Sequence, residues 1–157
     1  SSPFIFQGHY HLSPVVYGIC FACNAVAIML GSLSVVRFRS NEHALRIGGW
    51  GFMLLCCCAV VTLCMELPII IVEIVFFGFM FFLGIILPTS TTLALNLERK
   101  NSGTASAILG FLTFLGGGIV SPLTGIGNIL YSTSLIMFIC CVLIVVCNRK
   151  VLKNRKA

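Results

Sequence analysis

The sequence predicts an all-α integral membrane protein with five transmembrane helices. Hydrophobic residues make up 59% of the 157 positions and charged residues 9%, which is too few charges to coat a soluble domain of this size. Several uncharged stretches reach the roughly 18 or more residues that a helix needs to cross a hydrocarbon layer about 30 Å thick. Short polar turns separate these stretches, so we expect spans at about 14–36, 44–65, 68–95, 103–127 and 129–147.

The first two spans have clear boundaries. Ser13 supplies an N-cap, and Pro14 fits the first helical position, where a missing N–H costs nothing. Arg37 begins the polar turn that ends this span, and Arg46 marks the first turn of the second span, near the headgroups. We expect the second span to return through a tight hairpin at Pro68.

The other three spans are less regular. Pro88 lies inside the third span and is expected to kink it, because proline removes one backbone hydrogen bond. No charged residue occurs from Gly103 to Asn148, which is enough chain for two passes with a turn at 125–128. The fifth helix is expected to end at Asn148, followed by a basic tail over residues 148–157.

The positive charges predict how the chain lies in the membrane. With five spans, all ten Lys and Arg residues fall on one side: in the loops after the first and third spans, at Arg46 and in the tail. Such a bias marks the cytoplasmic side, so we expect a multi-pass protein of the cell inner membrane with a cytoplasmic C-terminus. No signal peptide is recognisable, and we expect the chain to begin partway through a longer one.

Several other functional classes are not expected. The positive charges form short clusters at the ends of apolar stretches rather than one basic face, so we expect no nucleic-acid partner. No phosphate-binding loop, nucleophile elbow or paired carboxylate motif is present, so we expect neither an enzyme nor a cofactor. Cys20 with Cys23 and His9 with His11 superficially resemble metal ligands, but zinc needs four converging groups, and we expect no metal site.

Most of the nine cysteines lie inside apolar runs. Without polar loops around them they do not resemble a disulfide framework, and we expect them to be small, buried apolar residues. The members of this group are Cys56, Cys57, Cys58, Cys64, Cys140, Cys141 and Cys147.

A few polar and aromatic side chains inside the spans are candidates for a substrate cavity. Glu73 is the one acidic residue within an apolar run; it lines an aqueous cavity, or it reaches water at the headgroups, and the sequence does not decide between the two. For Asn24 we favour a hydrogen bond between helices over contact with a ligand. Phe77 and Phe81 belong to a run of five phenylalanines, of which one or two are expected to line a hydrophobic pocket.

The fourth span carries small residues at helical spacing. Such a face lets a neighbouring helix approach closely, and we favour tight packing over a moving contact. Proline beside three consecutive glycines favours the moving, gating contact. The packing or gating residues are Gly103, Ala107, Gly110, Gly117, Ser121 and Pro122.

Four stretches carry a resemblance to a known family: Ser2 to Gln7, Tyr17 to Ala25, Pro88 to Leu95 and Gly103 to Ala107. Together they resemble the C-terminal half of a major facilitator superfamily (MFS) drug/proton antiporter of the bicyclomycin- and chloramphenicol-resistance (Bcr/CflA) type. The resemblance implies the end of helix 7 and helices 8–12, a partial six-helix bundle whose N-terminal partner half is missing from this sequence. It also implies export of small amphipathic drug-like substrates in exchange for protons, by alternating access. Glu73 matches no motif of that family.

Two other functions remain open. The chain is alternatively a non-transporting membrane subunit or interaction protein that packs through its glycine-rich helix. Metal or small-ion transport through the cysteines is a third possibility. The preceding reading frame distinguishes the transporter from the non-transporting subunit. About seven further helices would support the transporter, and an authentic start just before Ser1 would support the subunit.

Overall fold

The computed structural model describes residues 13–65, 67–97, 101–123 and 129–154, without the side chains of residue 97, 129–131 and 152–154. This part of the chain is helical throughout, apart from short connections, and the predicted all-α fold with five spans is confirmed. Each helix is long and apolar enough to cross a membrane. The helices are α1 (Pro14–Ser34), α2 (Asn41–Cys64), α3 (Ile69–Leu97), α4 (Ser102–Leu123) and α5 (Ile129–Asn154), with a short 3-10 turn, η2 (Val35–Arg37), after α1.

Local signals explain where these helices begin and end. Ser13 caps α1 as predicted, accepting a hydrogen bond from the Val16 N–H at 3.3 Å. α2 begins at Asn41, a few residues before the expected start, because the Ser40 hydroxyl caps it. α5 continues past the expected end at Asn148 to Asn154, since the Arg and Lys residues there are good helix formers and suit the C-terminal end of a helix dipole.

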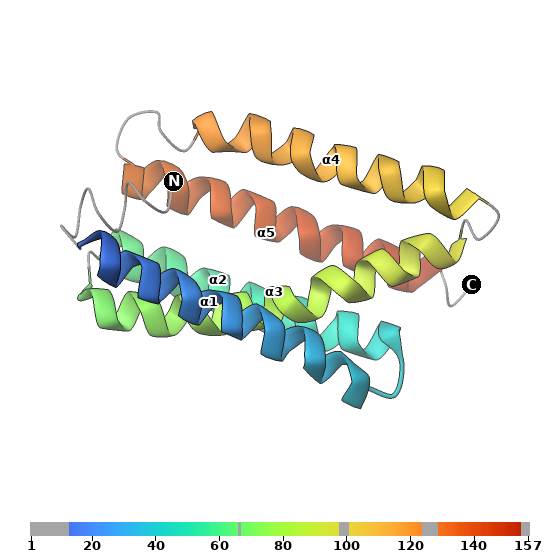
Figure 1. The fold of residues 1–157 in the computed structure, drawn as a ribbon, viewed down its shortest axis with the longest axis horizontal. Helices are drawn as coiled ribbons and strands as arrows, with labels where there is room; N and C mark the ends of the chain where they lie inside the picture. Colours follow the sequence, from blue (N-terminus) through green and yellow to red (C-terminus); the bar gives the residue numbers. More distant parts are fainter. Residues whose placement is uncertain (1–12, 66, 98–100, 124–128, 155–157) are drawn as a thin grey trace.

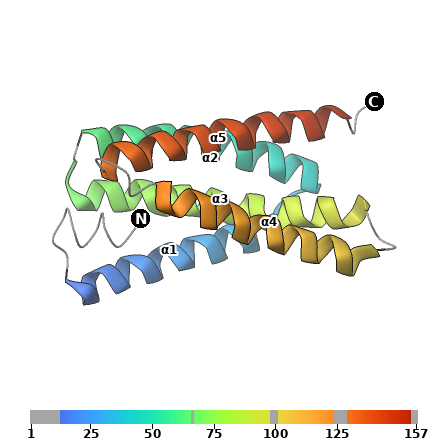
Figure 2. The same cartoon turned by 90° about the horizontal axis from the view of Figure 1, so that it is seen from above.

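The helices run side by side along a common axis (Figure 1; Figure 2). α3 packs against both α1 and α2, and α5 packs against the other side of α2. α4 lies apart, with few contacts, mainly to α3, and none of its described residues is buried. The C-terminal ends of α1, α3 and α5 share one end of the bundle with the N-terminal ends of α2 and α4 (Figure 1). The described basic residues therefore gather at that one end.

The main apolar core lies between α2, α3 and α5. The rings of Phe52 on α2 and Phe79 on α3 stack with centroids 4.4 Å apart. At Gly51 a Cβ would overlap the ring of Phe82, so the glycine admits that aromatic ring between α2 and α3. The buried members of the core are Leu45, Phe52, Cys56, Ile86, Leu93 and Cys141.

α3 continues through Pro88 and bends in its second half (Figure 1). Proline donates no backbone hydrogen bond to the Gly84 carbonyl, which loosens the helix at this point. The next four residues, Thr89 to Thr92, each donate a side-chain hydroxyl to the carbonyl four residues earlier, at 2.6 to 2.8 Å. In lipid, where no water is available, such bonds satisfy the hydroxyl groups within their own helix.

All nine cysteines are free, and only some are buried. Cys56 and Cys141 lie in the core, as predicted. The expected burial is wrong for Cys57, Cys58, Cys64 and Cys147, which are exposed on the helix surfaces. Consecutive residues of a helix point about 100° apart, so a run of three cysteines cannot share one buried face.

Candidate functional site

α1 and α3 touch backbone to backbone through two glycines. A Cβ at Gly31 would overlap the carbonyl oxygen of Phe81, and a Cβ at Gly84 would overlap that of Ile28. Ala27, one turn before Gly31, is completely buried. Small residues at such a crossing let two membrane helices approach closely, because in lipid their association depends on van der Waals packing.

This crossing brings together two polar residues that the sequence places 49 positions apart. Asn24 lies two helical turns before Gly31, and Glu73 lies three turns before Gly84, so each faces the same way as the glycine on its own helix. The Asn24 side-chain amide donates a hydrogen bond to Glu73 Oε1 at 2.9 Å. The hydrogen bond between helices predicted for Asn24 is present, and its partner is Glu73.

The Asn24–Glu73 pair is incompletely satisfied. Glu73 Oε2 and Asn24 Oδ1 are both buried and have no hydrogen-bond partner within the described structure. Such an unpaired buried acceptor costs about 1–3 kcal/mol, and more where it is charged. Among the described residues, Glu73 is the one carboxylate within the apolar part of a span, since Glu42 lies in the first turn of α2. The pair is therefore an acceptor site that a proton or a hydrogen-bond donor would complete.

Two cavities flank the pair. The larger, of about 450 Å³, has Glu73 in its wall, and the smaller, of about 220 Å³, has Asn24. Cys20, one turn before Asn24, lines both. The larger cavity falls within the usual size of small-molecule sites, which is about 300–1,000 Å³. Its other lining residues are Val16, Cys23, Ile69, Ile70, Ile74 and Phe77, so an apolar pocket surrounds a single carboxylate.

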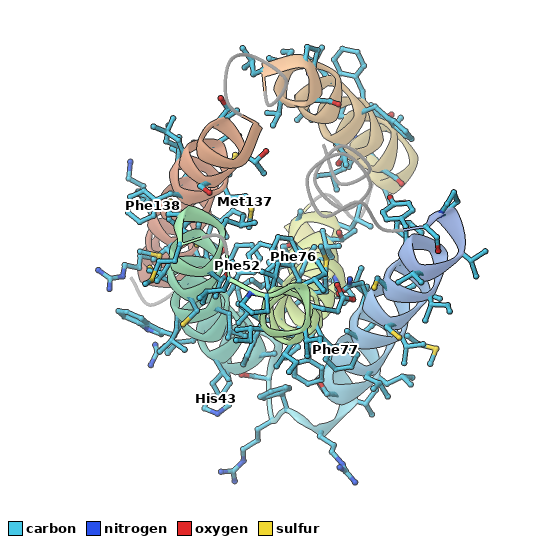
Figure 3. The ribbon with its side chains drawn as sticks, turned by 90° about the vertical axis from the view of Figure 1, so that its left-hand side faces the viewer. His43, Phe52, Phe76, Phe77, Met137 and Phe138 are labelled. Carbon is cyan, nitrogen blue, oxygen red and sulfur yellow. The ribbon has the colours of Figure 1, made fainter. Side chains whose placement is uncertain are left out.

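The phenylalanines of α3 divide between different surroundings. Phe76 and Phe77 leave the helix in different directions (Figure 3), and they line the smaller and the larger cavity respectively. Phe81 lines neither of these two cavities; its ring packs edge-on against Phe82, with centroids 5.6 Å apart. The contact of Phe81 with a substrate stays a prediction.

The predicted packing or gating face of α4 has no close neighbour at its glycines. Nothing lies within 4 Å of a Cβ placed at Gly103, Gly110 or Gly117. Ala107 is exposed, and Pro122 lies inside α4 near its end, one residue after Ser121. Close packing by glycine occurs instead between α1 and α3, so a packing or gating role for α4 stays a prediction.

Other sequence features contribute little to this site. No three His, Cys, Asp or Glu side chains within the described ranges are placed to hold a metal ion. His9 and His11 lie outside the described residues, as does the stretch from Ser2 to Gln7. Sequence reasoning missed Gly31, Gly84 and the position of Cys20 in both cavities. Cys20 and Asn24 are four residues apart and therefore share one face of the helix, and this spacing indicates that Cys20 lies beside Asn24 at the site.

Comparison with known proteins adds one relative. No family model and no solved structure matches the chain. The chain is 35% identical over 130 residues to the uncharacterized MFS-type transporter YdgK of Bacillus subtilis strain 168, and the match covers 81% of this chain. This similarity supports membership of the MFS. The chain spans about a third, 32%, of the length of this MFS-type relative. The narrower resemblance to the Bcr/CflA drug antiporters stays a prediction.

Proposed function

We propose that this chain is part of a secondary active transporter that exports small amphipathic molecules in exchange for protons, by alternating access. The observation that carries the proposal is the Asn24–Glu73 pair, an unsatisfied acceptor site between two cavities in a membrane-spanning bundle. Ionisable residues inside spans are costly, and they commonly mark proton relays or substrate paths. Similarity to an MFS-type transporter supports the same class of function.

The geometry offers a simple basis for exchange. The Glu73 carboxylate can bind a proton or accept a charge-assisted hydrogen bond from a cationic substrate group, and protonation removes the negative charge that attracts the cation. Ile74 and Phe77 line the same cavity as Glu73, and their apolar surface suits the hydrophobic part of an amphipathic molecule. Proton and cationic substrate therefore compete for one negative charge, and such competition is a basis for exchange transport.

We propose that further parts of the transporter lie outside this sequence. Because the match covers only 32% of the relative, we propose that an N-terminal half closes the substrate path against α1, α3 and α4. The glycine face of α4 would then meet a neighbour that is absent here. We also propose that the basic end of the bundle faces the cytoplasm of a cell with the protein in its inner membrane.

Export from cells that carry the full-length gene tests the transport proposal. A fluorescent cationic amphipathic dye is expected to accumulate less in these cells than in cells with an empty vector. Collapse of the proton gradient by an uncoupler is expected to raise dye accumulation to the empty-vector level. Export that continues unchanged after the collapse would count against proton coupling, and equal accumulation in both strains before it would count against export.

Thiol labelling tests the orientation. In a variant whose only cysteine is Cys64, at the end of α2 away from the basic residues, a membrane-impermeant maleimide is expected to react in intact cells. A variant with His43→Cys alone, at the basic end, is expected to react only after the cells are opened. The reverse pattern would place the basic end outside.

A second candidate function is a non-transporting membrane subunit. The observation that favours it is the exposed glycine face of α4, which has no close neighbour in the described structure. Under this proposal a second membrane protein would remain bound on purification, and the full-length gene would give no dye export. Export by the purified protein alone in vesicles would exclude it.

A further inference from the structure

A cationic side chain is held over an aromatic ring where α2 and α5 meet at the basic end of the bundle. The guanidinium carbon of Arg149 lies 4.8 Å from the centroid of the Trp50 ring. Trp50 is 56% exposed on the outer surface of the helix pair, and tryptophan favours the headgroup level of a bilayer. The stacked pair therefore marks a cationic site at the depth of the lipid headgroups.

The contact between α2 and α5 fixes this arrangement. A Cβ placed at Gly49 would come within 3.2 Å of Asn148 Nδ2, so the glycine lets α5 lie close to α2. Trp50 and Arg149 are the next residues on their respective helices, and the close contact sets their relative positions. Asn148 Nδ2 is itself buried without a hydrogen-bond acceptor in the described structure, which leaves an unused donor beside Arg149.

Three side chains of the site, Arg46, Arg149 and Lys150, are basic. A cation–π contact with the Trp50 ring uses none of the lone-pair acceptors that the five guanidinium N–H donors require, so Arg149 still has donors for an anion. The described residues give Arg149 no carboxylate partner, and Lys150 beside it is exposed. Arg46 lies one turn before Trp50 on α2. Glu42 is the described carboxylate nearest in sequence, one turn before Arg46 at the start of α2.

We propose that this basic cluster, the Trp50–Arg149 pair with Arg46 one turn away on α2 and Lys150 next on α5, binds the phosphate of an anionic phospholipid. Arginine forms paired hydrogen bonds with phosphate oxygens, and basic pockets between membrane helices suit anionic headgroups. The basic cluster lies on α2 and α5, whereas the two cavities are lined by residues of α1 and α3. The proposal therefore rests on the chain spanning a membrane and does not depend on what the protein transports.

Lipid titration of the purified full-length protein, followed by native mass spectrometry, tests the proposal. Phosphatidylglycerol is expected to bind more tightly than phosphatidylcholine with the same acyl chains. Arg149→Gln is expected to weaken phosphatidylglycerol binding about fivefold, the effect of one basic residue near an anionic headgroup, and to leave phosphatidylcholine binding unchanged. Arg37→Gln is the matched control, because it removes the same charge from the same end of the bundle but next to α1. Its phosphatidylglycerol affinity is expected to stay within about twofold of the unmodified protein.

Three results with these variants and ligands would overturn the proposal, and a fourth applies if Arg149→Gln does not fold. The first is an equal loss of affinity in Arg149→Gln and Arg37→Gln, which would indicate general attraction by surface charge. The second is an unchanged preference for phosphatidylglycerol in Arg149→Gln. The third is binding of inorganic phosphate alone at the same site and strength, which would assign the site to a soluble ion. If Arg149→Gln does not fold, Arg149→Lys keeps the charge without the planar, stacked donors, and an affinity equal to that of the unmodified protein would also overturn the proposal.

Discussion

Replacing Glu73 with glutamine is expected to reduce proton-driven dye export about tenfold or more, while the amount of protein in the membrane stays the same. Glutamine has the same shape as glutamate and still accepts the hydrogen bond from Asn24, but it cannot ionise. A positioned group that takes part in proton transfer contributes on the order of 10²–10⁴-fold to a rate, so its loss is expected to dominate the transport rate. Dye accumulation in energised cells measures the effect.

Glu42→Gln is the matched control for this prediction. It makes the same chemical change in the first turn of α2, outside the apolar part of the span, and is expected to export normally. Export and pH dependence that Glu73→Gln leaves unaltered would remove Glu73 from the transport mechanism. Equal losses in both variants would point to a general effect of lost acidic charge.

Replacing Gly84 with alanine is expected to destabilise the fold by about 1–3 kcal/mol, the range for an overpacked core site. Its new Cβ would overlap the backbone carbonyl of Ile28, which cannot move aside as a flexible side chain can. α1 and α3 would have to separate, and the Asn24–Glu73 hydrogen bond would weaken with them. The midpoint of unfolding in a mixed-detergent titration measures the effect.

Gly110→Ala on α4 makes the identical substitution in open space. Nothing lies within 4 Å of its new Cβ, and alanine favours a helix by about 1 kcal/mol over glycine. This variant is therefore expected to match or slightly exceed the stability of the unmodified chain. If the two alanine variants unfold at the same midpoint, α1 and α3 do not cross as closely as described.

The helices can be predicted from the sequence because the thickness and apolar character of the bilayer fix the length and composition of a spanning helix. A run of about 20 apolar residues between polar turns has few alternatives to a span, so the count and order of helices follow. The exact ends are less certain, since a single cap such as Ser40 moves a boundary by several residues. The basic residues after Asn148 show the same limit, because good helix formers continue a helix beyond the membrane.

The contacts between helices are harder to predict. The fourth span carries the longest stripe of small residues, yet the close crossing uses Gly31 and Gly84. Ala27 and Gly31 have the small-xxx-small spacing, but it is a single short pair, and Gly84 has no small residue four positions away on either side. The sequence shows Asn24 and Glu73 as polar groups within spans, but their pairing depends on how α1 and α3 cross. That crossing comes from packing, which no local pattern encodes.

The central claim is that Asn24 and Glu73 form one site, and a double-mutant cycle tests it most directly. Asn24→Asp alone places a carboxylate beside the Glu73 carboxylate and is expected to lower the free energy of unfolding. Adding Glu73→Gln moves the single carboxylate from α3 to α1 and keeps a hydrogen-bonding pair, so stability is expected to recover. We predict a coupling free energy of about 1 kcal/mol between the two changes, within the range for polar pairs in membranes. The claim would be contradicted if the two single-mutant changes in unfolding free energy add up to the double-mutant change to within about 0.3 kcal/mol. Residues that do not touch show such additivity.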